Sequence, residues 1–154
     1  MCCPGPFFSS VVLGGTAILN LGSDEQKDEL LPRLANGKLI LSLAATEPGN
    51  WYGMDNIQAV IREDGPDLIL DGTKLFVENA HISDYILCVA RTVGRNADTG
   101  LSLVLVDPNS PGVACAMLDT LAFEKQCEVV FDKVSVSRAH VLGELGGRGL
   151  HWRI

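Results

Sequence analysis

The strongest constraint on the fold is the spacing of short apolar runs after residue 37. These runs alternate with glycine, proline, asparagine and aspartate at intervals of about ten residues, which is typical of an all-β sandwich or barrel. The pattern predicts a mainly β fold of about eight mostly antiparallel strands. Turns are predicted at residues 63–66, 71–72, 94–100 and 107–112. The predicted strands cover residues 39–46, 57–63, 68–74, 85–92, 101–106, 113–118, 127–131 and 134–136.

The first 37 residues predict two short α-helices ahead of the strands. Residues 7–21 are small and apolar, so they favour a buried helix despite an internal glycine pair. Ser23 and Gln26 have the spacing of a capping box, in which two side chains satisfy backbone N–H groups at the start of a helix. A second helix is therefore predicted over residues 24–35.

Composition excludes several classes of partner. The chain has 154 residues, of which 47% are apolar, and this is enough for one domain with its own core. Its net charge of -7 opposes binding to nucleic acid or anionic membranes, and no apolar run approaches the roughly 20 residues of a membrane span. Five cysteines without a CxxC pair, and no signal-peptide pattern, favour a cytoplasmic location. His81, His140 and His151 lack acids or cysteines at ligand spacing, so no metal site is expected.

Several collinear motifs resemble one protein family. GSDEQK and LPRLANGK lie within residues 22–38, TEPG follows at residues 46–49, and LDGTKLFVENA covers residues 70–80. In this order they resemble the sequence that leads into and builds the middle domain of acyl-CoA dehydrogenases. Further matches are ART at residues 90–92, LVD at 105–107, PGV at 111–113, VFDKVSV at 130–136 and LGE at 142–144.

The resemblance implies a domain organisation. Residues 1–37 correspond to the end of an N-terminal helical domain, residues 38–142 to a β-barrel middle domain, and residues 143–154 to a glycine-rich exit linker. The family also has a C-terminal helical domain with a catalytic glutamate, and this sequence has no counterpart of it. That base removes an α-proton from an acyl-CoA thioester while a hydride passes to FAD. The chain is therefore expected to hold no catalytic residue and to be inactive alone.

The resemblance also assigns the first half of a flavin-binding face. In the family, backbone N–H groups and the threonine of TEPG hydrogen-bond the flavin ring, and the matching residues are Leu43, Ala45 and Thr46. The alternative is that Thr46 only satisfies a turn at the end of a strand. The rest of the motif is expected to be structural, with Glu47 in solvent next to a turn.

The second half of the face departs from the family pattern. An aromatic residue and a threonine are expected there, and the matching residues are Phe76, Val77 and Glu78, so a carboxylate replaces the threonine. The alternative is a core aromatic at Phe76 with Glu78 in solvent. After TEPG, the family has small residues beside the substrate, whereas this chain has Trp51 and Tyr52. These residues imply a reshaped acyl-CoA site or the loss of that site.

The sequence leaves two functions open, and a third has only the strand pattern in its favour. The first is the FAD-binding middle domain of an acyl-CoA dehydrogenase-like oxidoreductase. The second is a non-catalytic structural module of a heteromeric acyl-CoA dehydrogenase, which the departures from the family pattern favour. A generic ligand-binding β-barrel would require the motif matches to be accidental. A homo- or hetero-oligomer is expected in either family role, because a lone middle domain exposes surface that its neighbours cover.

Overall fold

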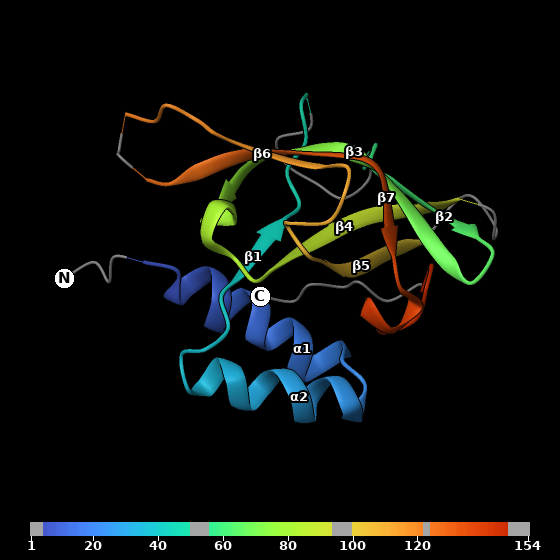
Figure 1. Cartoon of the computed structure of the whole chain (residues 1–154), viewed down its shortest axis with the longest axis horizontal. Helices are drawn as coiled ribbons and strands as arrows, with labels where there is room; N and C mark the ends of the chain where they lie inside the picture. Colours follow the sequence, from blue (N-terminus) through green and yellow to red (C-terminus); the bar gives the residue numbers. More distant parts are fainter. Residues whose placement is uncertain (1–4, 50–55, 94–99, 122–123, 148–154) are drawn as a thin grey trace.

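A computed structural model describes residues 5–49, 56–93, 100–121 and 124–147. In these residues eight strands form one sheet, and the N-terminal helices lie together along one side of it (Figure 1). The order is β6-β7-β3-β2-β4-β5-β8, with β1 paired to β4, and no pairing between β6 and β8 closes the described sheet. The mainly β prediction is confirmed. The strands are β1 (Leu41–Ala44), β2 (Val60–Asp64), β3 (Asp67–Glu78), β4 (Tyr85–Val93), β5 (Leu101–Val106), β6 (Val113–Met117), β7 (Gln126–Val136) and β8 (Val141–Leu142).

β1 and β2 lie end to end along one edge of β4. β1 pairs in parallel with residues 85–88 of β4, and residues 60–62 of β2 pair in parallel with residues 91–93. The other ladders are antiparallel, as predicted for most of the sheet. The chain therefore leaves the edge of β4 after β1 and rejoins it at β2. We call the segment between β1 and β2, residues 45–59, the excursion, and the TEPG motif lies in it.

β4 is an internal strand of the sheet. It pairs with β1 and β2 on one edge and with β5 on the other. Its middle residues are fully buried, and burying such side chains is the main favourable contribution to folding. They are Ile86, Leu87, Cys88, Val89 and Ala90.

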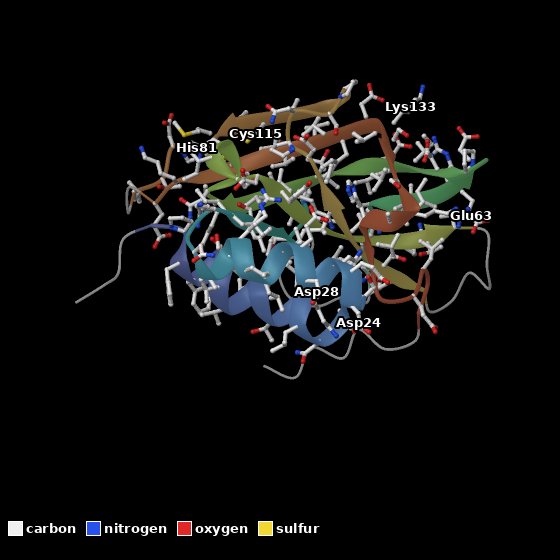
Figure 2. The ribbon with its side chains drawn as sticks, turned by 60° about the horizontal axis from the view of Figure 1, so that its bottom comes forward. Asp24, Asp28, Glu63, His81, Cys115 and Lys133 are labelled. Carbon is white, nitrogen blue, oxygen red and sulfur yellow. The ribbon has the colours of Figure 1, made fainter. Side chains whose placement is uncertain are left out.

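The helical segment contains the predicted elements. The first helix begins as a wide, π-type segment, η1 (Phe8–Gly15), and continues as α1 (Thr16–Leu21). The second is α2 (Asp24–Ala35), which carries Asp24 and Asp28 on its exposed side (Figure 2). Within the described ranges, no helix has the length and apolar character needed to cross a membrane.

The capping box of α2 is confirmed. Ser23 Oγ accepts a hydrogen bond from Gln26 N at 3.2 Å, and Gln26 Oε1 accepts one from Ser23 N at 2.9 Å. Gln26 also donates through Nε2 to Ala139 O at 2.7 Å and to Val141 O at 3.0 Å. Gln26 therefore both starts α2 and attaches it to the segment that leads into β8.

The prediction of a buried first helix is wrong for one of its faces. Ser10 and Ile18 are buried on the side that meets the sheet, but apolar residues also occupy the opposite side. The sheet can cover only one face of a helix, so the other face remains exposed. The exposed apolar residues are Phe7, Phe8, Val11, Val12 and Leu19.

The turn predicted at residues 71–72 is wrong, because β3 continues through both of them. The pairing of β3 with β7 is irregular between Leu70 and Gly72. A Cβ atom at Gly72 would lie 2.5 Å from Ala59 Cβ, so this glycine permits a close approach of the excursion to β3.

The C-terminal part differs from the prediction in two ways. The two strands predicted over residues 127–131 and 134–136 form the single strand β7, which bends at Lys133, where φ is 49°. The short strand β8 is not predicted by the sequence pattern. Two short 3₁₀ helices, η2 (Ala80–Ile82) and η3 (Arg138–His140), complete the described elements.

Candidate functional site

The structure brings together the two segments that carry the expected flavin contacts. Leu75 N on β3 donates a hydrogen bond to Thr46 O in the excursion at 2.9 Å. Phe76 follows directly after Leu75, so the predicted aromatic contact and the predicted threonine contact lie on neighbouring backbones. Thr46 is partly exposed, and its backbone carbonyl oxygen bonds a distant strand, while the role of its side chain stays a prediction.

Phe76 has an unusual backbone conformation. Its φ is 56°, and the register between β3 and β7 shifts between Lys74 and Val77. A left-handed conformation costs a residue with a side chain roughly 1–2 kcal/mol. The side chain is 38% exposed, so the alternative of a core aromatic is wrong. Strained residues of this kind cluster at binding and catalytic sites, which supports a functional role for this bulge.

The neighbours of Phe76 point in different directions. The Val77 side chain is fully buried, so only its backbone can face a cofactor. Glu78 is exposed, and its backbone pairs with Gln126 of β7. Its carboxylate therefore reaches solvent near Phe76.

The remaining predicted residues lie on both sides of the Thr46 segment. Leu43, on β1, and Ala45, just after it, are partly buried and pack against the core. Trp51 and Tyr52 lie outside the described residues. The predicted substrate contacts at these two positions therefore stay predictions.

The prediction that Glu47 is in solvent is wrong. Its side chain is 1% exposed, and Oε1 lies 2.7 Å from Nζ of Lys74, which is 0% exposed. The carboxylate also accepts hydrogen bonds from Gln58 N at 2.5 Å and Ala59 N at 2.9 Å. A buried carboxylate needs such donors, because removing an unpaired charge from water is very costly. Both residues lie in family-like motifs, but no pattern in the sequence indicates that they form a pair.

The surroundings of the pair are closed to water. Burial raises the pKa of the Cys88 thiol to about 12; to a smaller extent the charge of Lys74 lowers this pKa and the charge of Glu47 raises it. Ser42 Oγ, on the adjacent strand β1, is buried without a hydrogen-bond partner among the described residues. The ion pair therefore lies close to Cys88 of β4, in the interior of the protein rather than at a surface where water would weaken it.

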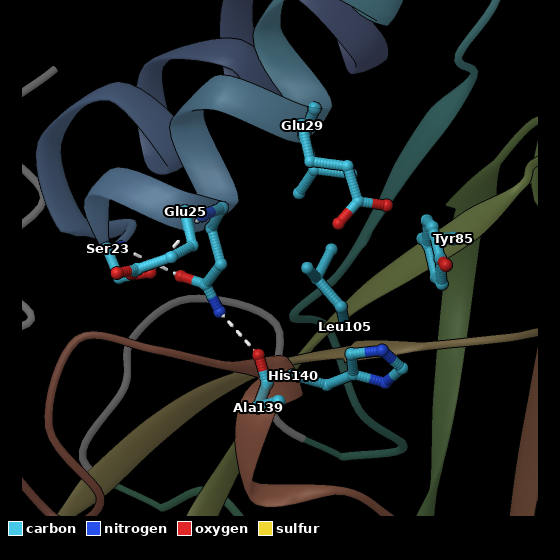
Figure 3. A pocket seen from close by; sticks show the side chains of 9 residues that line it. Ser23, Glu25, Glu29, Tyr85, Leu105, Ala139 and His140 are labelled. Carbon is cyan, nitrogen blue, oxygen red and sulfur yellow. Dashed lines mark hydrogen bonds between the residues drawn. The ribbon is translucent and has the colours of Figure 1, made fainter.

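A cavity of about 410 Å³ lies elsewhere, between α2 and the strands β4 and β5 (Figure 3). Its floor includes Leu30 and Leu105, and the rings of Tyr85 and His140 meet edge to face beside it. Glu25 and Glu29 line its rim, so we call it the acidic cavity. The cavity contains none of the predicted flavin contacts. Two carboxylates on the rim also oppose the diphosphate of a dinucleotide.

The carboxylate of Glu25 is held in its charged form. A backbone hydrogen bond at the start of α2, and then the Ser23 side chain, lower the pKa of Glu25. Glu25 therefore adds a negative charge to the rim at neutral pH. This makes the Thr46 and Phe76 region the better candidate for a dinucleotide cofactor.

Comparison with known proteins gives the family. A family model described as the middle domain of acyl-CoA dehydrogenase matches residues 42–134. The mitochondrial long-chain specific acyl-CoA dehydrogenase of Sus scrofa is 34% identical over 150 residues, which cover 92% of this chain and 34% of that protein. A 3-(aryl)acrylate reductase of Clostridium sporogenes is 32% identical, over 85% of this chain and 36% of its own length.

Solved structures agree with the sequence comparison. Glutaryl-CoA dehydrogenase from Mycobacterium smegmatis in complex with FADH2 has a TM-score of 0.77 and 31% identity, over 87% of this chain and 34% of that one. The ChsE4-ChsE5 complex from Mycobacterium tuberculosis has a TM-score of 0.87 and 27% identity, over 94% of this chain and 38% of that one. The chain spans about a third of the length of these relatives. Because the family model covers more than half of its residues, this chain belongs to the acyl-CoA dehydrogenase family and contains the middle domain of that family.

Proposed function

We propose that this chain is the FAD-binding middle domain of an acyl-CoA dehydrogenase-like oxidoreductase and is inactive by itself. The observation that carries the proposal is the hydrogen bond from Leu75 N to Thr46 O, which joins the two segments expected to contact the flavin. The similar glutaryl-CoA dehydrogenase was solved with FADH2, which supports a flavin as the ligand.

The residues of this face suit a flavin. Phe76 exposes an aromatic ring, and planar ring systems pack favourably against such a surface. Thr46 offers a hydroxyl group, and Leu43, Ala45 and Val77 offer backbone groups on the two adjoining segments. A bound ring would be held by the apolar surface of Phe76 and oriented by hydrogen bonds on the Thr46 side.

Bound FAD would supply the hydride acceptor for α,β-dehydrogenation of an acyl-CoA thioester. The residues of this chain would hold and orient the ring and exclude water from one side of it. Glu78 adds a negative charge near Phe76, which disfavours an anionic reduced flavin. We therefore expect FAD bound here to have a lower reduction potential than FAD bound to a Glu78→Thr variant.

The whole protein's substrate and organisation are further parts of the proposal. We propose that Trp51 and Tyr52 narrow the region where family members admit the acyl-CoA. We also propose the boundaries given by the sequence: a helical segment at residues 1–37, the middle domain at 38–142 and an exit linker at 143–154. The first part of that linker docks on the sheet, because Gly146 N donates to Ser102 Oγ at 2.8 Å.

Titration of the purified chain with FAD tests the proposal. Flavin fluorescence and the melting temperature should both change saturably, since a ligand that binds only the folded state raises stability. Thr46→Val and Phe76→Ala should weaken binding, whereas Tyr85→Phe, in the acidic cavity, should leave it unchanged. Binding that is insensitive to Phe76→Ala would place FAD elsewhere and contradict the proposal.

A non-catalytic structural module of a heteromer is the second candidate. It is favoured by the exposed apolar face of the first helix and by the carboxylate of Glu78 in place of threonine. The similar ChsE4-ChsE5 structure is a complex of two different chains. Absence of FAD binding, together with concentration-dependent association in light scattering, would favour this second role.

A further inference from the structure

The buried ion pair lies directly behind the candidate flavin-binding face. Glu47 follows Thr46 in the excursion, and Lys74 precedes Leu75 in β3. The backbone bond between Thr46 and Leu75 and the ion pair between Glu47 and Lys74 are therefore consecutive links between the same two segments. The second link is electrostatic and fully shielded from water.

The Glu47 carboxylate also connects the start of the excursion to its end. Oε1 accepts from Lys74 Nζ at 2.7 Å and from Ala59 N at 2.9 Å, and Oε2 accepts from Gln58 N at 2.5 Å. Three parts of the chain, at residues 47, 58–59 and 74, thus meet at one carboxylate. Any shift of the excursion along β3 would break several of these bonds together.

Stability alone is a poor explanation for such a pair. Replacing a buried ion pair with apolar residues of similar volume is often neutral or stabilising, because two charges no longer have to lose their water. The best-attested use of buried polar groups is to fix one arrangement among several of similar energy. An apolar residue at position 47 would also leave the N–H groups of Gln58 and Ala59 without an acceptor, so the carboxylate ties down the excursion as well as neutralising Lys74.

We propose that Glu47 and Lys74 are positioning residues that fix the Thr46 segment against Phe76, and with it the spacing of the two halves of the cofactor face. The functional meaning of this inference rests on the proposed function. Its structural part concerns only the attachment of the excursion to β3. Neither side chain is accessible to a cofactor, so both act through their neighbours.

The test uses the double variant Glu47→Gln/Lys74→Met in the full chain. It removes both charges together, keeps the approximate volume of each side chain, and avoids leaving one charge buried alone. The matched control is Thr92→Val, which removes the buried contact of 2.7 Å between Thr92 Oγ1 and Ser102 Oγ, on strands β4 and β5. The control destabilises the core without touching the excursion.

Two readouts separate positioning from general stability. The first is hydrogen exchange of the Leu75 amide, which is bonded to Thr46 O, relative to the core amides of β4 and β5. We expect the double variant to exchange at Leu75 at least about tenfold faster relative to those core amides, because a local opening no longer requires global unfolding. The second is the Kd for FAD, which we expect to rise at least about tenfold in the double variant. The rise in Thr92→Val should be smaller for the same loss of melting temperature.

The outcomes are distinct. If Leu75 exchange changes only in proportion to the core amides, and the FAD affinity of the double variant matches that of Thr92→Val, the pair is merely structural and the inference is overturned. If the wild-type chain does not bind FAD, the proposed function fails for this chain, and with it the role toward the cofactor. The Leu75 amide still decides whether the pair fixes the excursion.

Discussion

Glu47 Oε1 and Lys74 Nζ lie 2.7 Å apart, with side chains that are 1% and 0% exposed. The same protein has an ion pair at its surface, where Arg62 Nη1 lies 2.6 Å from Asp71 Oδ2. The two pairs have nearly equal distances but very different surroundings. Burial, rather than distance, decides what happens when one partner is removed.

Lys74→Met should be strongly destabilising. It leaves the Glu47 carboxylate buried without its counter-charge, and removal of one partner of a buried pair costs about 3–5 kcal/mol. Arg62→Met is the matched control, because an exposed pair contributes about 0–1 kcal/mol. Urea unfolding of the two variants measures the difference. Equal losses would mean that water or another cation compensates Glu47 when Lys74 is absent.

At position 76, a glycine variant should be more stable than an alanine variant, which is the reverse of the usual order in a strand. In a strand, glycine is normally less stable than alanine by about 0.5–1 kcal/mol, but the φ of 56° at Phe76 favours glycine. We expect Phe76→Gly to be more stable than Phe76→Ala by about 1 kcal/mol in urea unfolding, because only alanine keeps the strain. Both variants should bind FAD weakly, since both lack the ring. A more stable alanine variant would show that the left-handed conformation relaxes when the ring is removed.

Much of the fold follows from local patterns in the sequence. The strand β4 is predicted from its apolar run, and the limits of β5 are correctly predicted because turn residues bound that run on both sides. The capping residues Ser23 and Gln26 likewise define the start of α2. These features depend on neighbours in the sequence, which is why a single chain reveals them.

The errors concern features that depend on distant contacts. Gly72 has the sequence signature of a turn, but its lack of a side chain serves the close approach of Ala59. Glu47 was expected in solvent because isolated carboxylates seldom become buried, and its partner Lys74 lies 27 positions away. The left-handed backbone of Phe76 is imposed by the bulge against β7. Family motifs located Thr46 and Phe76, but only the structure shows the bond that joins their segments.

Cys88 and Cys115 should react more slowly than a free thiol. Partial burial and the neighbouring Cys127 raise the pKa of Cys115 to about 12, although Cys115 is exposed near His81 at the edge of the sheet (Figure 2). Alkylation requires the thiolate, so Cys115 should react slowly with iodoacetamide at pH 7 and about tenfold faster for each unit of pH up to about pH 10.

Peptide mapping after timed alkylation measures these rates. Cys127→Ser should speed the reaction of Cys115, because it removes a group that raises the pKa of that thiol. Cys88, which is fully buried, should react only after unfolding. Labelling of Cys115 at the rate of a free thiol at pH 7 would contradict this expectation.

The charged carboxylate of Asp71 should stabilise the folded state at neutral pH, and protonation in acid should remove this contribution. The backbone N–H of Lys133, and then the Arg62 guanidinium, lower the pKa of Asp71 below its ordinary value of 3.8. A lowered carboxyl pKa stabilises the folded state above the ordinary pKa, and this contribution is lost as the pH falls through the folded pKa. Asp71→Asn should therefore be destabilising at pH 7, with the difference from wild type shrinking below about pH 4. A difference that stays constant from pH 7 to pH 3 in urea unfolding would contradict the role of the charge.

The most direct test of the flavin-binding face is an NMR titration of the ¹⁵N-labelled chain with FAD. We expect the largest amide shifts at Leu43, Ala45 and Thr46, and at residues 75–78, with small changes around Tyr85 and His140 in the acidic cavity. That result would place the cofactor on the two joined segments. Shifts centred on the acidic cavity, or saturable binding without shifts near Thr46 and Phe76, would contradict the proposed site.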